Sequence, residues 1–329
     1  MAGGTGVPDA DLLIYVTAVS TKSCSSSTLA YATACFLDQN DRPIVGSINF
    51  CLQSNAFSAL QTSDQQKVVL HETMHVLGFS SYLFSFFRDE TGQPRTPRCP
   101  GASGCGSSDT LNYPPLTPDG SSYVVSTSTV AQLNNIQYIV TPAVVNVARA
   151  YFACPTAIGA PLEDQGSTDT AGSHWKERML FAEVMNGVLD PDFTFVLSEF
   201  TLALLADSGW YRVNYAAADA APLLWGRGAG CAALGSGCAS SAPFCAATKA
   251  AACAFDRSAI GPCASLGAVM DNCAIVTPYS NEHCDNRGGT SDGRVTYYCT
   301  WGQTAGASRP AWRCRARVRT RGGAEGGWG

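Results

Sequence analysis

The sequence has 329 residues, of which 46% are hydrophobic and 14% are charged, and its formal net charge is −5. A chain of this length can form one large domain or two ordinary ones, each with a buried core. Its acidic balance gives no electrostatic reason to expect a nucleic-acid partner. The arginine-rich stretch from Arg309 to Arg321 is typical of a disordered, solvated tail.

Fifteen cysteines indicate a disulfide framework, because most intracellular compartments keep thiols reduced. No two of them have the C-x2-C spacing of zinc fingers or redox motifs. The odd count leaves at least one thiol without a partner in the chain. We therefore predict an extracellular or cell-surface protein.

The first residues, 1–6, are neither basic nor apolar, so no signal peptide is visible. No apolar run approaches the roughly 20 residues of a transmembrane helix. Attachment to a surface by another route stays open. We expect the chain to begin inside a longer secreted precursor.

Three strands are predicted at the start of the chain. Residues 11–18 form an apolar, β-branched run that is typical of a buried strand, and residues 29–36 and 44–50 are the next candidates. Turn-forming residues at 40–43 separate the last two. This part of the sequence predicts a small sheet.

A helix follows the strands. Ser63 to Gln66 has the S-x-x-Q form of a capping box, which predicts the helix start. Gly78 predicts its end, as a left-handed C-cap. The apolar residues between these points indicate that one face of the helix is buried.

Loop and further helix are predicted beyond residue 90. Residues 91–125 are rich in proline, glycine and serine and are expected to be loop. Apolar spacing predicts helical structure over residues 127–153 and again over residues 195–206. Gly209 is expected to close the last helix.

The pentapeptide His71-Glu72-Thr73-Met74-His75 lies inside the first predicted helix. Residues at i and i+4 share one helical face, so the imidazoles of His71 and His75 can reach one zinc ion. Glu72 projects beside that pair, where it can take a proton from a zinc-bound water and pass it to a leaving amine. The motif predicts a zinc-dependent peptidase with Zn²⁺ as cofactor and proteins or peptides as substrates. Chance spacing on a surface helix is the alternative, but the apolar flanks favour a buried helix.

A catalytic zinc ion needs a third protein ligand and one open position. The common extension H-E-x-x-H-x-x-G-x-x-H would place that ligand at Ser81, and serine is a poor zinc ligand. His283 lies beside Cys284 in the cysteine-rich region, where a structural role is favoured. His174 is the better candidate. Its ring must then lie within about 6 Å of the other two rings, given zinc–nitrogen bonds of roughly 2.0–2.1 Å.

Three segments, His71–Ser80, Ser173–Trp175 and Glu183–Gly187, together resemble the leishmanolysin family of metzincin peptidases. In that family a long insertion interrupts the metzincin motif before its third histidine. The resemblance implies that His174 is that ligand and that Met185 is the Met-turn methionine, which packs beneath the metal. It also implies broad action on proteins.

The resemblance extends over roughly residues 11–300 and implies an α+β fold, a metzincin-like zinc peptidase domain with a disulfide-rich C-terminal domain. Nine of the cysteines follow residue 212, in loop-rich sequence. We predict a catalytic domain (1–212), a cysteine-rich domain (213–314) and a disordered tail (315–329). The catalytic domain is expected to comprise a sheet and active-site helix (1–80), an insertion (81–170) and a closing segment with the third ligand, the Met-turn and the final helix (171–212).

Three other interpretations stay open. A zinc peptidase of another clan would take its third ligand from a glutamate, and Glu177 and Glu183 are available. Asp207-Ser208-Gly209 has the form of an aspartic-protease triplet, although a second triplet is absent and this one is expected to end a helix. A catalytically impaired, leishmanolysin-like surface adhesion or binding protein is the non-enzymatic alternative. The presence of Glu72 favours activity.

Overall fold

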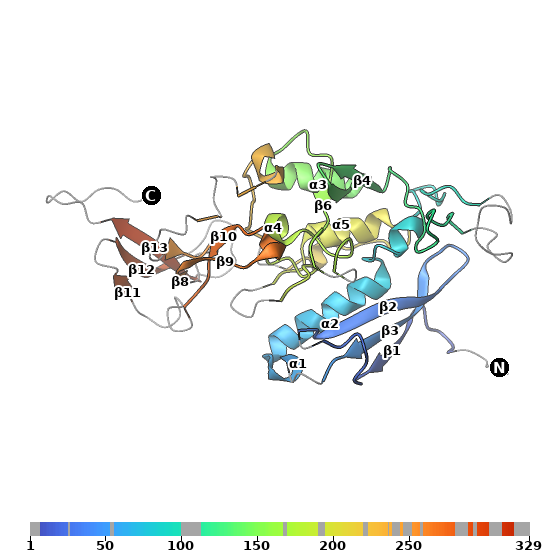
Figure 1. Cartoon of the computed structure of the whole chain (residues 1–329), viewed down its shortest axis with the longest axis horizontal. Helices are drawn as coiled ribbons and strands as arrows, with labels where there is room; N and C mark the ends of the chain where they lie inside the picture. The colour runs from blue at the N-terminus through green and yellow to red at the C-terminus, as the bar shows by residue number, and fades with distance from the viewer. Residues whose placement is uncertain are drawn as a thin grey trace. The chain divides into compact units, whose positions relative to one another are not determined.

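A three-stranded sheet occupies the N-terminal part of the computed structural model (Figure 1). It consists of β1 (Leu13–Thr17), β2 (Ala30–Leu37) and β3 (Pro43–Phe50), in the order β1-β3-β2. β1 runs parallel to β3, and β2 runs antiparallel to it. The three predicted strands are confirmed, with ends shifted by one or two residues.

The chain divides into two compact units whose segments alternate along the sequence. Unit 1 comprises Met1–Ala148, Ile158–Trp175 and Leu197–Ala218, and unit 2 comprises Arg149–Ala157, Lys176–Val196 and Asp219–Gly329. The domain boundary after residue 212 stays a prediction. Within these units the structure describes residues 7–25, 27–52, 56–99, 113–166, 170–189, 195–219, 223–235, 237–238, 244–245, 252–256, 259–279, 289–291, 295–302 and 311–318.

The long helix α2 (Thr62–Leu77) follows the one-turn helix α1 (Ala56–Ala59) and lies across one face of the sheet (Figure 1). It packs tightly against Gly46 of β3, where an added Cβ would lie 2.3 Å from Val76 Cγ1. Glycine at position 46 therefore lets the helix backbone approach the strand. This contact sets the distance between α2 and the sheet.

We expect Gly46→Ala to lower the free energy of unfolding by about 2 kcal/mol, because overpacking a tight core contact typically costs about 1–3 kcal/mol. Chemical denaturation of the single variant measures the loss. The double variant with Val76→Ala removes the clashing methyl groups, so its loss should be smaller than the sum of the two single losses. Additive losses would show that the two positions do not meet.

The structure differs from the sequence-based expectation at both ends of α2. Gln61, not Ser63, is the N-cap, and no side chain caps the first turn, so the predicted capping box is wrong. Gly78 is the C-cap, but its φ of 167° is extended rather than left-handed. An added Cβ at position 78 would lie 3.3 Å from Leu205 Cδ2. Close packing against Leu205, rather than a left-handed backbone, explains why a glycine is present at position 78.

Residues 127–153 are only partly helical, contrary to the prediction. A hairpin of β4 (Val130–Leu133) and β5 (Ile136–Ile139) precedes the helix α3 (Pro142–Phe152). Asn134 and Asn135 join the two strands with left-handed φ values of 51° and 65°. Two such residues form the tight turn that suits antiparallel strands, and this local signal outweighs the helical spacing. The strand β6 (Ala160–Pro161) completes a sheet in the order β4-β5-β6.

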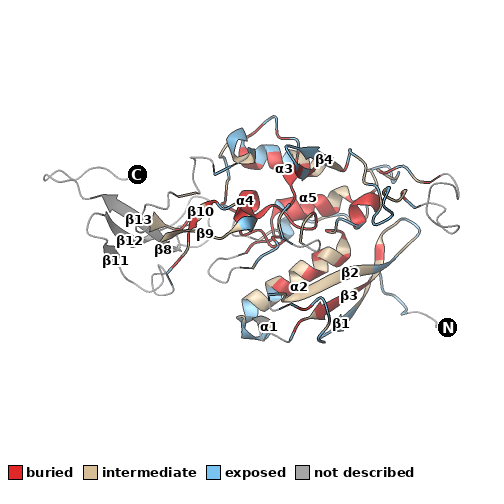
Figure 2. Cartoon of the chain, viewed as in Figure 1, coloured by how far each residue is buried: buried red, intermediate tan, exposed pale blue. Residues whose placement is uncertain are grey.

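The helix α5 (Glu199–Asp207) is mostly buried (Figure 2). It starts four residues later than predicted, because Ser198 caps it by accepting a hydrogen bond from the Phe200 amide. At its other end, Asp207 Oδ2 accepts a hydrogen bond from the Val144 amide (3.0 Å) in the first turn of α3. Gly209 has a left-handed φ of 78°. The Asp-Ser-Gly triplet therefore ends a helix, as expected, rather than serving as an aspartic-protease site.

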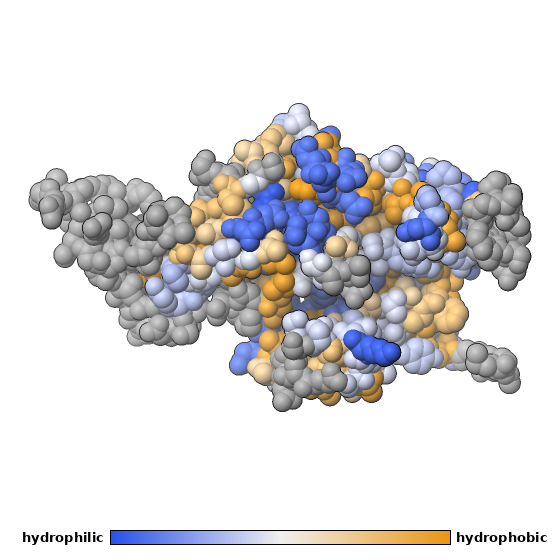
Figure 3. Space-filling model, viewed as in Figure 1, coloured by the Kyte–Doolittle hydropathy of each residue, from blue (hydrophilic) through white to orange (hydrophobic). Residues whose placement is uncertain are grey.

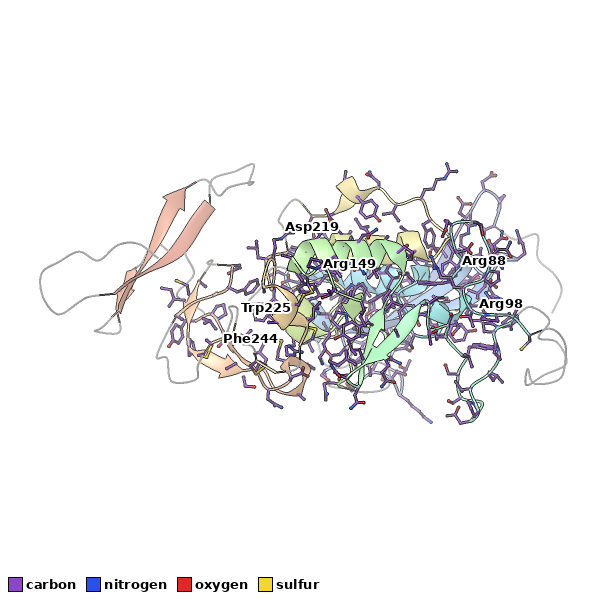
Figure 4. All side chains as sticks on the ribbon, turned by 90° about the horizontal axis from the view of Figure 1, so that it is seen from above. Arg88, Arg98, Arg149, Asp219, Trp225 and Phe244 are labelled. Atoms are coloured by element: carbon purple, nitrogen blue, oxygen red, sulfur yellow. A yellow bond between two sulfur atoms is a disulfide. The ribbon has the colours of Figure 1, made fainter. Side chains whose placement is uncertain are left out.

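An ion cluster joins the turn between β2 and β3 to the segment that follows α2. Arg88 Nη2 and Arg98 Nη2 lie 2.7 Å and 2.8 Å from Asp41 Oδ2. Figure 4 labels the two arginines near each other. All three side chains are at most 17% exposed. The buried 3-10 helix η1 (Leu83–Phe86) lies just before Arg88 in sequence. The cluster holds the start of the insertion to the sheet.

The two edge strands leave apolar side chains exposed. Tyr15 and Val16 of β1 and Phe36 of β2 are 58%, 64% and 67% exposed. Hydrophobic surface is visible over this part of the chain in the lower half of Figure 3. Among the described strands, β1 and β2 each pair with β3 alone, so these side chains lack a neighbouring strand on their outer side.

Aromatic rings form the core of unit 2. Trp225 packs against Phe181, Phe244 and Phe255, with ring centroids 5.1, 5.5 and 5.1 Å away, and its neighbour Phe244 is labelled beside it in Figure 4. The indole nitrogen of Trp225 donates to the Arg178 carbonyl (2.8 Å). This aromatic cluster, with Met270 and Ile275, forms a buried hydrophobic core in the loop-rich unit.

A buried charge cluster adds to that core. Lys176 and Arg178, whose side chains are 0% and 1% exposed, both contact the Asp271 carboxylate. Arg178 also donates to the carbonyls of Gly235 and Gly237. These contacts tie the short helix α4 (Glu177–Leu180) to the 3-10 helix η4 (Ala268–Met270).

The remaining elements are short. Two further 3-10 helices are η2 (Tyr215–Ala217) in unit 1 and η3 (Cys231–Leu234) in unit 2. Unit 2 also contains paired strands: β7 (Ala252–Cys253) with β8 (Ile260–Gly261), β9 (Cys263–Ser265) with β10 (Ala274–Val276), and β11 (Gly289–Ser291), β12 (Val295–Gly302) and β13 (Ala311–Val318) in one sheet. Residues 315–318, predicted as the start of a disordered tail, form the end of β13. The later part of that tail lies outside the described residues.

Four disulfides join described cysteines: Cys24–Cys51, Cys154–Cys231, Cys238–Cys273 and Cys245–Cys263. Cys35 is a free, exposed thiol, which confirms that at least one cysteine is left unpaired. The disulfides are consistent with an extracellular protein. Within the described residues, no helix combines the length and apolar character that crossing a membrane requires.

Candidate metal centre

Two histidines of α2 present their imidazoles on the same face of the helix. His71 and His75 are one turn apart, and their Nε2 atoms are 3.0 Å from each other. Their ring centroids are 4.6 Å apart, with the ring planes nearly perpendicular. The helical spacing in the sequence predicted this pairing.

The third imidazole comes from the far side of the insertion. His174, 103 positions from His71, places its Nε2 3.2 Å from the Nε2 of His71. Its ring centroid lies 5.1 Å from that of His71 and 4.9 Å from that of His75. These distances are inside the limit of about 6 Å expected for rings that share one zinc ion. The structure therefore brings together the three histidines selected from the sequence.

Backbone carbonyls orient two of the rings. Nδ1 of His75 lies 2.6 Å from the Phe79 carbonyl, and Nδ1 of His174 lies 2.8 Å from the Thr170 carbonyl. A carbonyl can only accept, so Nδ1 of each ring carries the proton and Nε2 carries a lone pair. These two Nε2 atoms are among the three imidazole nitrogens that converge. Sequence reasoning missed these carbonyls because a backbone atom leaves no residue-type signal.

The geometry and protonation of the rings fit a tetrahedral metal ion. Two nitrogens bound at about 2.05 Å with tetrahedral angles are roughly 3.3 Å apart, close to the observed separations of 3.0 Å and 3.2 Å. Burial, followed by the proximity of His71, lowers the pKa of His174 to about 3. Burial and the other two histidines also lower the pKa of His75. The rings of His75 and His174 are therefore neutral, as metal ligands must be.

Glu72 lies between the two histidines of α2 in sequence, and its side chain is buried. The residue is 5% exposed, and its Oε2 atom has no hydrogen-bond partner in the described part of the chain. Burial raises the pKa of Glu72 to about 8. A cation bound nearby would favour the charged form and oppose this shift. A buried carboxyl of this kind is a candidate for proton transfer.

The chain segment that carries His174 is held by β-type pairing. The Glu163 amide donates to the His174 carbonyl (2.9 Å), and Leu162 forms an antiparallel bridge with Trp175. The Leu162 amide in turn donates to Gln137 in β5 (2.8 Å). The hairpin that sequence reasoning took for a helix thus helps to support the third imidazole.

Trp175 anchors the same segment in the core of unit 1. It is fully buried, its ring centroid lies 4.7 Å from that of Phe79, and its indole nitrogen donates to Thr201 Oγ1 (3.0 Å) in α5. Phe79 is the residue whose carbonyl orients His75. One tryptophan therefore packs between the end of α2 and α5, immediately after His174.

Two further residues were singled out in the sequence, Met185 and His283. Met185 belongs to unit 2, is fully buried, and donates its amide hydrogen to the carboxylate of Glu183. Its predicted role beneath the metal stays a prediction. His283 lies outside the described residues. Among described side chains, the three histidines form the grouping able to hold a metal ion, which favours His174 over Glu177 or Glu183 as third ligand.

A helix that presents two histidines and a buried glutamate, completed by a distant third histidine, is an arrangement typical of metallopeptidase centres. The family model described as leishmanolysin matches residues 2–93 and 119–267 of this chain. The chain belongs to the leishmanolysin family of metallopeptidases. Its fold class is accordingly an α+β, metzincin-like peptidase domain with a disulfide-rich C-terminal part.

Similar proteins carry related names. A leishmanolysin-like peptidase of Drosophila melanogaster is 39% identical over 235 residues, which cover 70% of this chain and 34% of that protein. One from Caenorhabditis elegans is 37% identical over 238 residues, or 69% of this chain and 35% of the relative. The mouse ciliated left-right organizer metallopeptidase is 35% identical over 231 residues, or 69% and 29%. The chain thus spans about a third of the length of the curated relatives it matches.

Proposed function

We propose that this chain contains the catalytic centre of a zinc-dependent metalloendopeptidase that hydrolyses peptide bonds in proteins. His71, His75 and His174 bind the zinc ion, and Glu72 acts first as general base and then as general acid. The observation that carries the proposal is the convergence of three imidazole Nε2 atoms. Next to His71 in sequence stands Glu72, a buried residue whose Oε2 atom has no hydrogen-bond partner among the described residues.

The donor set supports zinc as the ion. Three neutral imidazoles with a fourth position left open are a usual arrangement for catalytic zinc. Magnesium and calcium prefer oxygen ligands and higher coordination numbers. Imidazole also binds other transition metals, so metal analysis of protein purified without added metal is the direct check of identity.

Proton transfer is the role of Glu72. His71, His75 and His174 would hold the zinc ion, which would supply Lewis-acid chemistry: polarisation of the scissile carbonyl and a lowered pKa of water at the site, so that a hydroxide-like nucleophile would be available near neutral pH. The Glu72 carboxylate accepts the proton of the attacking water on Oε2, the atom that has no hydrogen-bond partner among the described residues. It then delivers that proton to the nitrogen of the leaving amine. Both transfers use one carboxyl, so its loss removes both.

Three further assignments follow from the family and the disulfides. Proteins or peptides are the substrates, in keeping with the names of the relatives. Four disulfides among the described cysteines support an extracellular or cell-surface location. Met185 is the Met-turn methionine that supports the metal centre, as the family resemblance implies.

A chelator-reversible peptidase assay tests the proposal. We expect protein refolded with its disulfides to cleave an unstructured protein such as casein, to lose activity with 1,10-phenanthroline, and to regain it with about one equivalent of zinc per chain. Calcium or magnesium should not restore cleavage. Cleavage that persists in chelator would contradict a metallopeptidase. Zinc binding without cleavage would instead favour the catalytically impaired binding protein.

A further inference from the structure

The insertion between the second and third histidines begins and ends at one point in unit 1. Ser81 and Ser173 are 92 positions apart in the sequence, yet their side chains are in direct contact. Ser81 is the position at which an uninterrupted H-E-x-x-H-x-x-G-x-x-H motif would place its third histidine. Ser173 is the residue immediately before His174.

Two hydrogen bonds join this pair. The Ser81 amide donates to Ser173 Oγ (3.1 Å), and Ser173 Oγ donates to Ser81 Oγ (3.1 Å). The Ser173 hydroxyl is thus acceptor and donor at once, and Ser173 is only 9% exposed. Removing this hydroxyl breaks both bonds, whereas removing the Ser81 hydroxyl breaks only the second.

The neighbouring backbone makes the position of Ser173 specific. Gly172, just before it, has a left-handed φ of 78°, which favours glycine. The Gly172 amide donates to the Glu163 carbonyl (2.8 Å), while the Glu163 amide donates to the His174 carbonyl (2.9 Å). Backbone bonds therefore hold the segment on the insertion side, and Ser173 joins it by hydrogen bonds to Ser81, which follows α2.

We infer that Ser173 and Ser81 are positioning residues for the metal centre, and that their pair of hydrogen bonds sets the place of His174 relative to His71 and His75. This inference rests on the proposed function, because it assigns the two serines to the same metal site. The physical reason is the long chain between the ligands. If the two ends of this insertion were not joined, its different conformations would place the His174 imidazole at slightly different positions. A metal ligand has to be placed to within fractions of an ångström.

The test is a set of variants assayed for zinc affinity by competition with a chelating dye. We expect Ser173→Ala to weaken zinc binding about tenfold, as for other residues that orient metal ligands. Ser81→Ala, which keeps one of the two bonds, should weaken it about threefold. The double variant should match Ser173→Ala. Ser173→Thr keeps the hydroxyl and should restore binding to within about twofold of the starting protein.

A matched control exists within the insertion. Ser126 and Ser128 also form a hydroxyl–hydroxyl hydrogen bond (2.8 Å), but neither borders a histidine of the centre. Ser128→Ala should leave zinc affinity unchanged. The visible absorption spectrum of the Co²⁺-substituted protein should shift or broaden in Ser173→Ala and not in Ser128→Ala, since it reports the ligand geometry rather than overall stability.

Equal zinc affinity and an unchanged Co²⁺ spectrum in Ser173→Ala would overturn the inference, as would an equal loss in Ser128→Ala. Hydrogen exchange of the Ser81 amide in metal-free protein separates this outcome from failure of the proposed function. That amide should exchange at least about tenfold faster in Ser173→Ala, whether or not the starting protein binds zinc. Unchanged exchange would show that the pair of bonds does not form.

Discussion

Replacing Glu72 by glutamine is expected to lower peptide hydrolysis by at least about a thousandfold while the chain still binds one zinc ion, since general acid–base catalysis contributes about 10²–10⁴-fold. Glutamine has the size of glutamate but cannot accept and then release a proton at neutral pH. Glu72 is not among the three converging ligands, so the metal stays bound. Steady-state kinetics on a fluorogenic peptide and zinc content of the same sample measure both effects.

Asp64→Asn is the matched control for that substitution, because it removes a carboxylate from the first turn of the same helix. It should leave kcat and zinc content unchanged. The Glu72→Gln protein should also fold, because Oε2 has no partner in the described part of the chain to be lost. Hydrolysis retained by Glu72→Gln, with zinc still present, would remove the proposed mechanism and leave the metal site intact.

His174→Ala is expected to lower zinc affinity by more than about a hundredfold, a larger loss than removal of an orienting residue causes. Two imidazoles on one helix remain, and a two-ligand site holds zinc weakly compared with the usual three or four. Equilibrium dialysis gives the affinity, and far-ultraviolet circular dichroism of the metal-free variant shows whether it folds. His71→Ala and His75→Ala should give losses of similar size, because all three nitrogens converge equivalently.

The glutamate alternative makes the opposite prediction. If Glu177 or Glu183 supplied the third ligand, Glu177→Gln or Glu183→Gln would lower zinc content and His174→Ala would leave it unchanged. Glu183 already accepts the amide hydrogen of Met185. We therefore expect Glu183→Gln to disturb the backbone at Met185, the predicted Met-turn methionine, rather than to remove a bound ion.

The helical half of the metal centre could be predicted from the sequence because it is local. A spacing of four residues places His71 and His75 on one face in any α-helix, and the carboxyl of Glu72 follows from the same geometry. The strands before the helix were also predictable, since β-branched runs bounded by turn residues carry their own signal. The ends of the helix were less predictable. Gln61 caps α2 although Ser63 had the better capping pattern.

The other half of the centre could not be derived from periodicity. No local rule connects position 174 to position 71, and the resemblance to a family selected His174 from the remaining histidines. The structure around that residue was partly predicted wrongly, because the turn at Asn134 and Asn135 makes a hairpin where apolar spacing predicted a helix. The carbonyls of Phe79 and Thr170 are backbone groups, so their role emerges only from the folded coordinates.

The separation of 103 positions between His71 and His174 has a consequence for how the protein matures. During synthesis, the helix with its two imidazoles is complete long before the third leaves the ribosome, and early intermediates hold at most a weak two-ligand site. Contacts between residues so far apart in sequence form slowly, because a long loop must close before they stabilise anything. If the site binds zinc as proposed, tight binding is thus a late step, because it requires that the chain between His71 and His174 has already folded.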